Sequence, residues 1–332
     1  MKFNTKILGT GSYLPEKILT NNDIAKRVDT NHQWIVERTG IHERRIADPS
    51  KDETPSGMAK VATERALEMA NLTANDIDLI LFSATIPDQF FPNSGCMLQH
   101  KLGMTNACPA LDVNAACTGW MYAIPMADAM IKTGLYKHIL VVGSEMTSSF
   151  NNWDDRNTCI LFGDGCGVAI LGRASENEES QIYSTVLTAD STKKDHLQLL
   201  AGGAVKRITH DVLERGENWV SMNGQEVFKS AVKTMAALSE KVIHDSGKTM
   251  ADVDWFVPHQ ANLRIIEAVG NRFGFPPEKV IINVDKYANT SSATVPIALD
   301  ESIRSGKIKR GDNLLLAAFG AGLTAGAVFL KY

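Results

Sequence analysis

The stretch Thr73-Ala-Asn-Asp-Ile-Asp-Leu-Ile-Leu-Phe82 decides the fold, because a related stretch, Thr249-Met-Ala-Asp-Val-Asp-Trp-Phe-Val257, returns about half a chain length later. In both, a polar turn with threonine and aspartate leads into an apolar run of strand length. Two further pairs of segments match in the same order and at nearly the same offset: 131–142 with 303–316, and 162–171 with 319–330. Three matches in one order indicate a duplicated structural unit.

In each half, a segment with apolar residues at the spacing of a helix precedes the matched strand. These segments are 58–70 and 227–243. Strands and helices alternate through both halves, which is the pattern of a layered α/β protein. We therefore predict two halves, 1–175 and 176–332, that meet within the polar, acidic segment 174–180.

The composition is that of an ordinary globular protein, with 44% hydrophobic and 22% charged residues in 332. A net charge of −4 gives no general attraction to nucleic acid, so an anionic ligand would need a local basic patch. The first residues lack the apolar region of a signal peptide. The longest uncharged run, 314–330, is too short to span a membrane and contains three glycines, so we predict two buried strands joined by a turn. These features predict a cytoplasmic protein without a membrane segment.

The segment 188–218 and the cysteines give two further predictions. The segment 188–218 is mixed and contains glycines, and we predict a long surface excursion there, with a lid as one possible role. The cysteines form no CxxC pair and have no ligand-like spacing to histidine, so we expect reduced thiols and no metal site. They are Cys96, Cys108, Cys117, Cys159 and Cys166.

Three short stretches carry residue types suited to catalysis: Asn114-Ala-Ala-Cys-Thr-Gly119, Pro258-His-Gln-Ala-Asn262 and Asn289-Thr-Ser-Ser-Ala293. Each follows an apolar run that we predict as a strand: 110–113, 255–257 and 280–284. Chemistry in α/β sheets gathers where strands end. A thiol that meets a base and a polar side chain there is a candidate nucleophile. We therefore select Cys117, His259 and Asn289.

Cys117 opens a predicted helix over 118–131. A helix N-terminus stabilises a thiolate, so we expect a lowered pKa for this thiol. A lone cysteine is more often a small buried hydrophobe, and only its position and small neighbours favour the nucleophile here. Taken alone, His259 would be assigned a structural role and Asn289 a helix cap.

Two glycine-rich strings resemble nucleotide-binding loops, but neither fits one. Gly9-Thr-Gly11 lacks the third glycine and is followed by Pro15. Gly163-Asp-Gly-Cys-Gly167 leads into a strand, so no helix N-terminus follows to bind a pyrophosphate. A dinucleotide-dependent dehydrogenase is therefore not favoured.

The three stretches, in this order, resemble the active site of the β-ketoacyl-acyl-carrier-protein synthase III family. The resemblance extends over essentially the whole chain and includes Trp34-Ile-Val-Glu-Arg-Thr-Gly-Ile41, Phe91-Pro92 and Phe162-Gly-Asp-Gly165. Elongating synthases resemble a Cys-His-His pattern and thiolases a Cys-His-Cys pattern, so Asn289 favours this branch. The resemblance implies a thiolase-like fold, in which two duplicated halves form five αβαβα layers, and a homodimer.

The resemblance also implies the reaction. Cys117 would take an acyl group from acyl-CoA, with acetyl-CoA as the expected donor, and free CoA would leave. Malonyl-acyl-carrier-protein would then lose CO₂ and condense with the thioester, which initiates fatty acid synthesis without a cofactor. His259 and Asn289 would donate to the enolate, and the backbone N–H groups of Cys117 and Ala321 would form the oxyanion hole. Ala321 stands where the family usually has glycine.

Binding residues are likewise implied by the resemblance. The CoA-binding residues would be Trp34, Arg38, Thr39, Arg156 and Asn262. The carrier-protein patch would be Lys229, Arg264 and Arg272. Phe91 would cross the dimer and close the partner's acyl pocket, which favours a short primer.

Three alternatives stay open. A paralogue of the same family could condense other acyl chains for a specialised lipid, quinolone or polyketide-type product, and the acyl group carried by Cys117 would distinguish it. A non-catalytic protein that binds acyl-CoA or carrier protein would be expected to have lost a catalytic residue, yet all three are present. A papain-like cysteine hydrolase shares the residue types but not the duplicated α/β layout.

Overall fold

The computed structural model describes residues 3–175 and 178–332 and contains two mixed sheets. Residues 176 and 177, within the predicted join 174–180, lie outside the described residues. The first sheet has the order β1 (Thr5–Tyr13), β7 (Asp164–Arg173), β6 (His138–Met146), β4 (Leu79–Ser83), β5 (Ala110–Asp112). The second has the order β11 (Trp255–Pro258), β12 (Asn313–Gly320), β13 (Thr324–Lys331), β8 (Gln181–Ala189).

The two sheets repeat one pairing pattern. In the first, β4 is parallel to β6, β6 is antiparallel to β7, and β7 is antiparallel to β1. In the second, β11 is parallel to β12, β12 is antiparallel to β13, and β13 is antiparallel to β8. The matched segments of the sequence thus occupy matching strands, as the duplication predicts.

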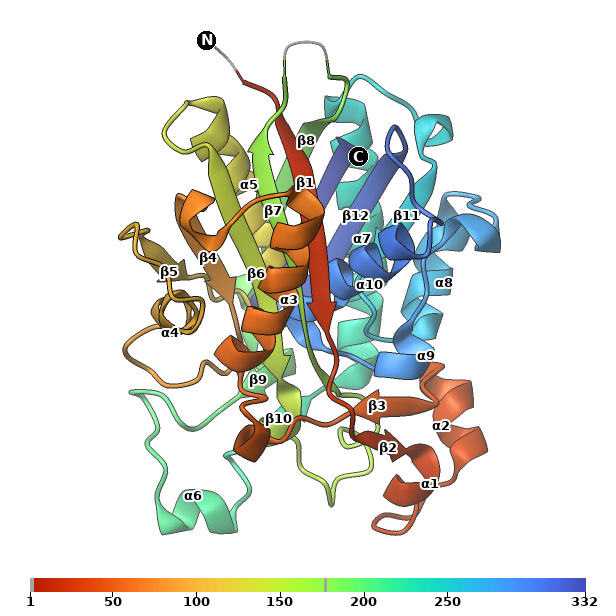
Figure 1. Cartoon of the computed structure of the whole chain (residues 1–332). Helices are drawn as coiled ribbons and strands as arrows, with labels where there is room; N and C mark the ends of the chain where they lie inside the picture. The colour runs from red at the N-terminus through yellow and green to blue at the C-terminus, as the bar shows by residue number, and fades with distance from the viewer. Residues whose placement is uncertain (1–2, 176–177) are drawn as a thin grey trace.

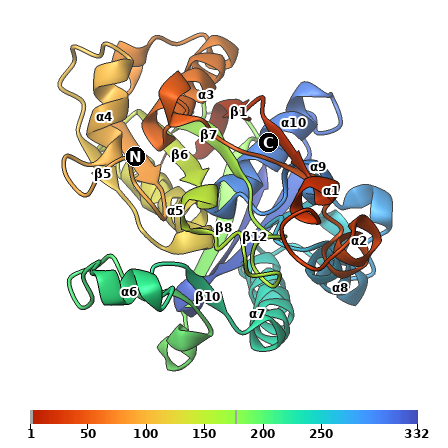
Figure 2. The ribbon, with the colours of Figure 1, turned by 90° about the horizontal axis from the view of Figure 1, so that it is seen from below.

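Helices form three layers around the two sheets (Figures 1 and 2). The outer face of the first sheet packs against α3 (Pro55–Ala70) and α4 (Ser94–Lys101). Between the sheets lie α5 (Gly119–Lys132) and α10 (Thr294–Arg304). The outer face of the second sheet packs against α7 (Gly224–Asp245) and α8 (Leu263–Arg272). The result is the predicted five-layer αβαβα arrangement.

Continuous apolar strands make these layers possible. In β6, Ile139 and Val141 face the central helices, whereas Leu140 and Val142 pack beneath α3. A strand buried on both faces needs such a run, since successive side chains point to opposite sides. Trp120 of α5 is fully buried in the central layer, and its Nε1 donates to the carbonyl of Val141 at 3.2 Å.

Most sequence-predicted elements occur where expected. The segment 58–70 lies in α3, 227–243 lies in α7, and 314–330 forms the hairpin of β12 and β13. The predicted strand at 280–284 is wrong, because only Val280 forms a bridge, to Phe256.

The side chain of Gln260 explains why no strand forms there. Its Oε1 accepts from the backbone N–H groups of Asn283 and Val284 at 2.9 and 3.2 Å, and its Nε2 donates to the carbonyl of Ile281 at 3.0 Å. These are bonds that a neighbouring strand would otherwise make. The short helix α9 (Val284–Tyr287) begins where the strand was expected to end.

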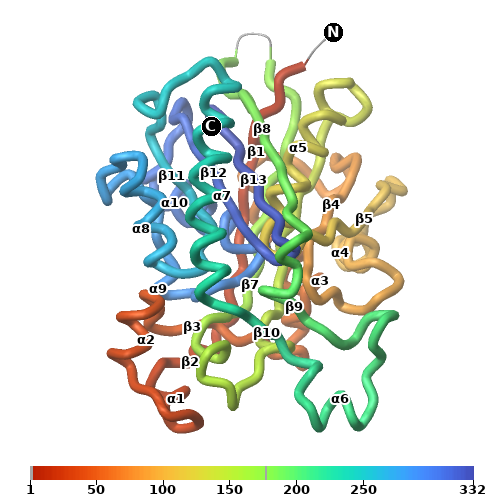
Figure 3. The backbone as a smooth tube through the Cα atoms, turned by 180° about the vertical axis from the view of Figure 1, so that it is seen from behind, coloured from red at the N-terminus to blue at the C-terminus, as the bar shows by residue number. Residues whose placement is uncertain are grey.

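The predicted excursion at 188–218 begins inside β8 and then leaves the sheets. It contains β9 (Leu197–Leu199) and α6 (His210–Glu214), and β9 pairs with β10 (Val220–Met222). The excursion lies at the same end of the molecule as α1 (Asn21–Ile24), α2 (His32–Thr39) and the hairpin of β2 (Ile18–Thr20) and β3 (Glu43–Arg45) (Figures 1 and 3). In the described part of the chain, no helix is both long and apolar enough to cross a membrane.

We expect Gly167→Ala to destabilise the protein by about 2 kcal/mol or more, because β7 passes close to α10 at this residue. A Cβ at Gly167 would lie 2.6 Å from the backbone nitrogen of Ile297 and 2.7 Å from the carbonyl carbon of Pro296. Urea denaturation measures the effect. Gly203→Ala is the matched control, because nothing lies within 4 Å of the added methyl group there. Equal losses in the two variants would contradict this account of the packing.

Candidate active site

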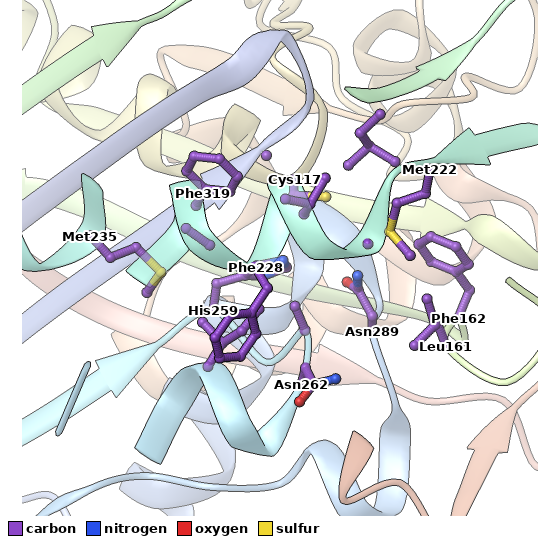
Figure 4. A pocket seen from close by; sticks show the side chains of 17 residues that line it. Cys117, Leu161, Phe162, Met222, Phe228, Met235, His259, Asn262, Asn289 and Phe319 are labelled. Carbon is purple, nitrogen blue, oxygen red and sulfur yellow. The ribbon is translucent and has the colours of Figure 1, made fainter. Parts of the chain in front are cut away.

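Three neighbouring cavities share lining residues, and Cys117 lines two of them. We name them the outer groove, of about 560 Å³, the central chamber, of about 140 Å³, and the inner cavity, of about 60 Å³. Cys117, His259 and Asn289 all line the central chamber (Figure 4). The chamber shares Leu161, Met222, Gly224 and Asn262 with the outer groove, and Cys117, Phe162 and Leu197 with the inner cavity.

Cys117 lies in a 3₁₀ turn, η3 (Ala116–Thr118), which leads directly into α5. Its side chain is buried, and burial raises the pKa of the thiol to about 11. This corrects the expectation of a lowered pKa, because desolvation outweighs the hydrogen bonds that the sulfur receives. A base within the chamber is therefore needed to form the thiolate near neutral pH.

Besides the hydroxyl of Ser291, the nearby backbone N–H groups of Cys117 and Ala321 act to lower the pKa of the Cys117 thiol, but less than burial raises it. Gly320 makes this approach possible, since a Cβ there would lie 3.0 Å from the Cβ and backbone nitrogen of Cys117. The left-handed residue of this turn is Gly322, with a φ of 128°. The methyl group of Ala321 therefore leaves the N–H donor in place, and it lines the inner cavity.

His259 follows β11 and is buried, with its backbone N–H donating to the carbonyl of Ala317 at 2.8 Å. Its Nδ1 lies 2.6 Å from the hydroxyl of Thr294, which also lies 3.1 Å from the carbonyl of Ser291. The Thr294 hydroxyl is thus able to accept from a protonated Nδ1 or to donate to an unprotonated one. Burial lowers the pKa of His259 to about 4, so the ring is neutral near pH 7.

Asn289 is held by its backbone and its side-chain oxygen. Its N–H donates to the carbonyl of Leu161 at 2.9 Å, and its carbonyl accepts from the N–H of Gly163 at 3.1 Å. The Oδ1 accepts from the N–H of Ser291 at 2.8 Å. Because Oδ1 already accepts this hydrogen bond, the Nδ2 hydrogens are the side-chain donors of Asn289 available to a ligand in the chamber.

The outer groove gathers most of the residues predicted to bind CoA. Trp34, Arg38, Thr39 and Asn262 line it. The guanidinium carbons of Arg38 and Arg156 lie 4.5 and 5.0 Å from the Trp34 ring centroid. Arg and Trp stack favourably in this geometry.

Two of the side chains predicted to bind CoA form hydrogen bonds within the protein. The hydroxyl of Thr39 donates to the carbonyl of Ile35 at 2.7 Å. The side chain of Asn262 donates to the carbonyl of Arg38 at 3.0 Å and accepts from the N–H of Arg264 at 2.9 Å. Asn262 therefore shapes the junction between the groove and the chamber, which it lines on both sides.

The remaining predicted residues do not gather in one place. Phe91 is 86% exposed on the loop between β4 and α4. Arg264 lines the outer groove, and Lys229 lies in the second turn of α7, where it pairs with Glu226. Arg272 lies about 12 Å further along α8, at the 1.5 Å rise per residue of a helix, and it pairs with Glu240.

Sequence reasoning missed several residues of the site. Ser291 and Thr294, which contact the catalytic candidates, fell within or beside the third quoted stretch but carried no signal of their own. Trp219 lines the outer groove, and Leu197 and Val220 line the inner cavity. These three lie between residues 197 and 220, in the excursion and at the start of β10 or just before it, and the position of this segment beside the site depends on tertiary structure.

A five-layer α/β fold with a thiol, an imidazole and a carboxamide around one chamber defines a thiolase-like condensing enzyme. Residues 111–191 match the family model for 3-oxoacyl-[acyl-carrier-protein (ACP)] synthase III, and residues 243–332 match the model for its C-terminal part. The β-ketoacyl-[acyl-carrier-protein] synthase III of Caldanaerobacter subterraneus subsp. tengcongensis is 48% identical over 331 residues, which is 100% of this chain and 98% of that protein.

Solved structures agree. The synthase III of Aquifex aeolicus matches with a TM-score of 0.90 and 42% identity, over 99% of this chain and 100% of that one. The priming β-ketosynthase of the R1128 polyketide biosynthetic pathway matches with a TM-score of 0.90 and 33% identity, over 99% of this chain and 97% of that one. The chain belongs to the β-ketoacyl-acyl-carrier-protein synthase III family, the condensing acyltransferases that initiate fatty acid synthesis.

We expect His259 to make the protein less stable in acid. Its pKa in the folded protein, about 4, lies below the ordinary 6.5, so the unfolded chain takes up the proton first. The stability that depends on neutral His259 is present above pH 6.5 and is lost as the pH falls towards 4. The urea midpoint should therefore fall less between pH 7.5 and pH 5 in His259→Gln than in the wild type. His244→Gln is the control, since that side chain is 90% exposed. An equal fall in all three proteins would refute the assignment.

Proposed function

We propose that the chain transfers an acetyl group from acetyl-CoA to Cys117 and then condenses it with malonyl-acyl-carrier-protein. The products are free CoA, CO₂ and a β-ketoacyl-carrier-protein. The observation that carries the proposal is the place of Cys117 between the central chamber and the inner cavity, with the outer groove adjoining the same chamber through four shared residues. The outer groove receives the nucleotide and pantetheine arm, the chamber holds the thioester, and the inner cavity receives the acyl chain.

In the first half-reaction, the Nε2 atom of neutral His259 takes the proton of the Cys117 thiol. The sulfur attacks the thioester carbonyl of acetyl-CoA, and the negative oxygen accepts from the backbone N–H groups of Cys117 and Ala321. The carbon–sulfur bond to CoA breaks, CoA leaves with the proton from His259, and acetyl-Cys117 remains. The tautomer with a proton on Nδ1, held by the hydroxyl of Thr294, leaves Nε2 ready as the base.

In the second half-reaction, malonyl-acyl-carrier-protein loses CO₂ and forms an enolate. Its oxygen accepts from Nδ2 of Asn289 and from Nε2–H of His259. This step uses the other tautomer, in which the Thr294 hydroxyl donates to Nδ1. The enolate carbon attacks the acetyl carbonyl, and the bond to the Cys117 sulfur breaks. The β-ketoacyl product leaves on the carrier protein, and the Cys117 thiolate takes up a proton from solvent.

Intact mass measurement after addition of acetyl-CoA should show a gain of one acetyl group that maps to Cys117. Malonyl-acyl-carrier-protein should then remove it, with release of a β-ketoacyl product. Cys117→Ala should show no gain. Asn289→Ala should acylate at the wild-type rate, and His259→Ala should acylate more slowly because it lacks the base. Both variants should fail to decarboxylate malonyl groups. Normal condensation by Asn289→Ala would show that its assigned role is wrong. The absence of acylation by any donor would favour the alternative of a non-catalytic binding protein.

Ala321→Gly should widen the acyl range, because it removes a methyl group from the wall of the inner cavity and keeps the N–H donor. We expect the rate with butyryl-CoA relative to acetyl-CoA to rise by up to about tenfold, the scale of a missing methylene. Single-turnover acylation of Cys117 by the two donors gives this ratio. An unchanged ratio would mean that other side chains of the cavity limit the acyl length.

A paralogue that condenses other acyl chains for a specialised product is the second candidate. The likeness to a priming β-ketosynthase of a polyketide pathway supports it, because one fold serves both activities. A cavity of about 60 Å³ beside Cys117 favours the short primer instead. Acylation by longer acyl-CoAs alone, with none by acetyl-CoA, would decide for the paralogue.

Other sequence predictions enter the proposal as expectations. The chain works in the cytoplasm as a homodimer, and Phe91 of each copy closes the inner cavity of the other. Its exposure of 86% and its place on a loop suit such a contact.

The boundary between the halves falls at 175/176, between β7 and β8. Lys229 and Arg264 receive the acidic carrier protein at the rim of the outer groove, and Arg272 belongs to the same patch at its far end.

A further inference from the structure

Ser291 contacts two of the proposed catalytic residues directly and the third through Thr294. Its hydroxyl lies 3.6 Å from the Cys117 sulfur, in donor geometry. Its backbone N–H donates to Oδ1 of Asn289 at 2.8 Å. Its carbonyl lies 3.1 Å from the Thr294 hydroxyl that contacts His259. Ser291 thus links the thiol, the carboxamide and the imidazole through three different groups.

The backbone of Ser291 is held in a conformation that serines rarely adopt. Its φ is 51°, in the left-handed region, and the residue is 2% exposed. Such a conformation persists only where the surroundings enforce it, and it is common at functional sites. Here it directs the N–H group towards Asn289 while the hydroxyl turns towards Cys117.

The surroundings that hold Ser291 centre on Glu145, a fully buried carboxyl group on β6. Glu145 accepts from the N–H and hydroxyl of Thr85 at 2.9 and 3.0 Å, and from the hydroxyl of Ser292 at 2.6 Å. The Thr85 hydroxyl lies 3.2 Å from that of Ser291. Among the described residues, no Lys, Arg or His side chain forms an ion pair with Glu145. Its partners are therefore the hydroxyls and N–H groups around the nucleophile.

We propose that the hydroxyl of Ser291 donates a hydrogen bond to the sulfur of the Cys117 thiolate and is a further catalytic residue of this site. Thr85 and Glu145 act as positioning residues for it. With Glu145 ionised, the Thr85 hydroxyl donates to the carboxylate. The Ser291 hydroxyl then has two acceptors, the oxygen of Thr85 at 3.2 Å and the sulfur of Cys117 at 3.6 Å. When the sulfur becomes negative, it is the stronger acceptor, and the hydroxyl turns to it.

The chamber supplies little else to stabilise a negative sulfur. The titratable groups near the thiol are Glu145 on β6 and His259 after β11. Burial raises the pKa of Glu145, and its charge, where present, opposes a thiolate, whereas His259 is neutral near pH 7. The other groups that favour the thiolate are the nearby N–H groups of Cys117 and Ala321. When the thioester is attacked, these two N–H groups donate to the oxyanion. The Ser291 hydroxyl remains available to donate to the Cys117 sulfur when that sulfur becomes the leaving group at the end of the second half-reaction.

The test is the rate of alkylation of Cys117 by iodoacetamide across pH 6 to 10, resolved from the other thiols by peptide mass spectrometry. Because the thiol titrates above this range, the pH midpoint of each protein is taken as the pH at which its rate equals half of the wild-type rate at pH 9. Ser291→Ala and Ser291→Gly both remove the hydroxyl, and glycine also relieves the left-handed backbone. We expect the alkylation rate at pH 7.5 to fall about tenfold in both and the pH midpoint to rise by about one unit. Thr85→Val, which keeps the shape but removes the hydroxyl, should shift the midpoint in the same direction by less.

The matched control is Ser239→Ala, which removes a buried serine hydroxyl on α7 that has no hydrogen-bond partner in the described structure. Its midpoint should equal that of the wild type. An unchanged or lowered midpoint in both Ser291 variants would overturn the proposal. A raised midpoint in Ser291→Ala but not in Ser291→Gly would also overturn it, since backbone strain would then be the cause.

The inference rests on the proposed acylation of Cys117, and the assay separates the two. Alkylation needs neither acyl-CoA nor carrier protein, so it reports on the thiol even if the chain accepts no acyl donor. In the acylation assay, loss of the Ser291 hydroxyl should lower the rate at saturating acetyl-CoA about tenfold and leave the half-saturating concentration unchanged. A change confined to half-saturation would contradict a role at the sulfur.

Discussion

The burial of one helical layer between two sheets is the constraint on which the rest of the structure depends. Both α5 and α10 pack against sheets on either side, and each begins with a 3₁₀ turn at the central chamber. One turn carries Cys117, and the other carries Ser291, two residues after Asn289. A shift of either helix would therefore separate groups that must act together, so the packing of the core also fixes the geometry of the site.

The duplication explains why these two turns meet. In each half, a residue with a positive φ opens the turn, Ala116 with 46° and Ser291 with 51°. By this register, Cys117 in the first half corresponds to Ser292 in the second, whose hydroxyl is bound to Glu145. One copy of the turn thus presents the proposed nucleophile, and the other presents the residues that hold it. The two halves thus share one backbone conformation at this turn, and their different side chains give the two copies complementary roles.

The sequence predicted the fold well because the duplication and the apolar strand runs are local patterns. It also selected Cys117, His259 and Asn289, which line one chamber in the structure, although the strand expected before Asn289 does not form. The hydrogen bonds of Gln260 that replace that strand could not be predicted from periodicity. The lowered pKa expected for Cys117 was wrong for a similar reason, because a helix N-terminus is visible in a sequence but the depth of burial is not.

The small volume of the inner cavity limits how many condensations such an enzyme can carry out on one acyl chain. Each condensation lengthens the acyl group by two carbons, and a cavity of about 60 Å³ that suits the primer has little room for the longer product. If Cys117 takes a short primer as proposed, the longer product would not reload onto Cys117 and would pass to other enzymes for elongation. The wall that limits the primer would then also confine this site to the first condensation.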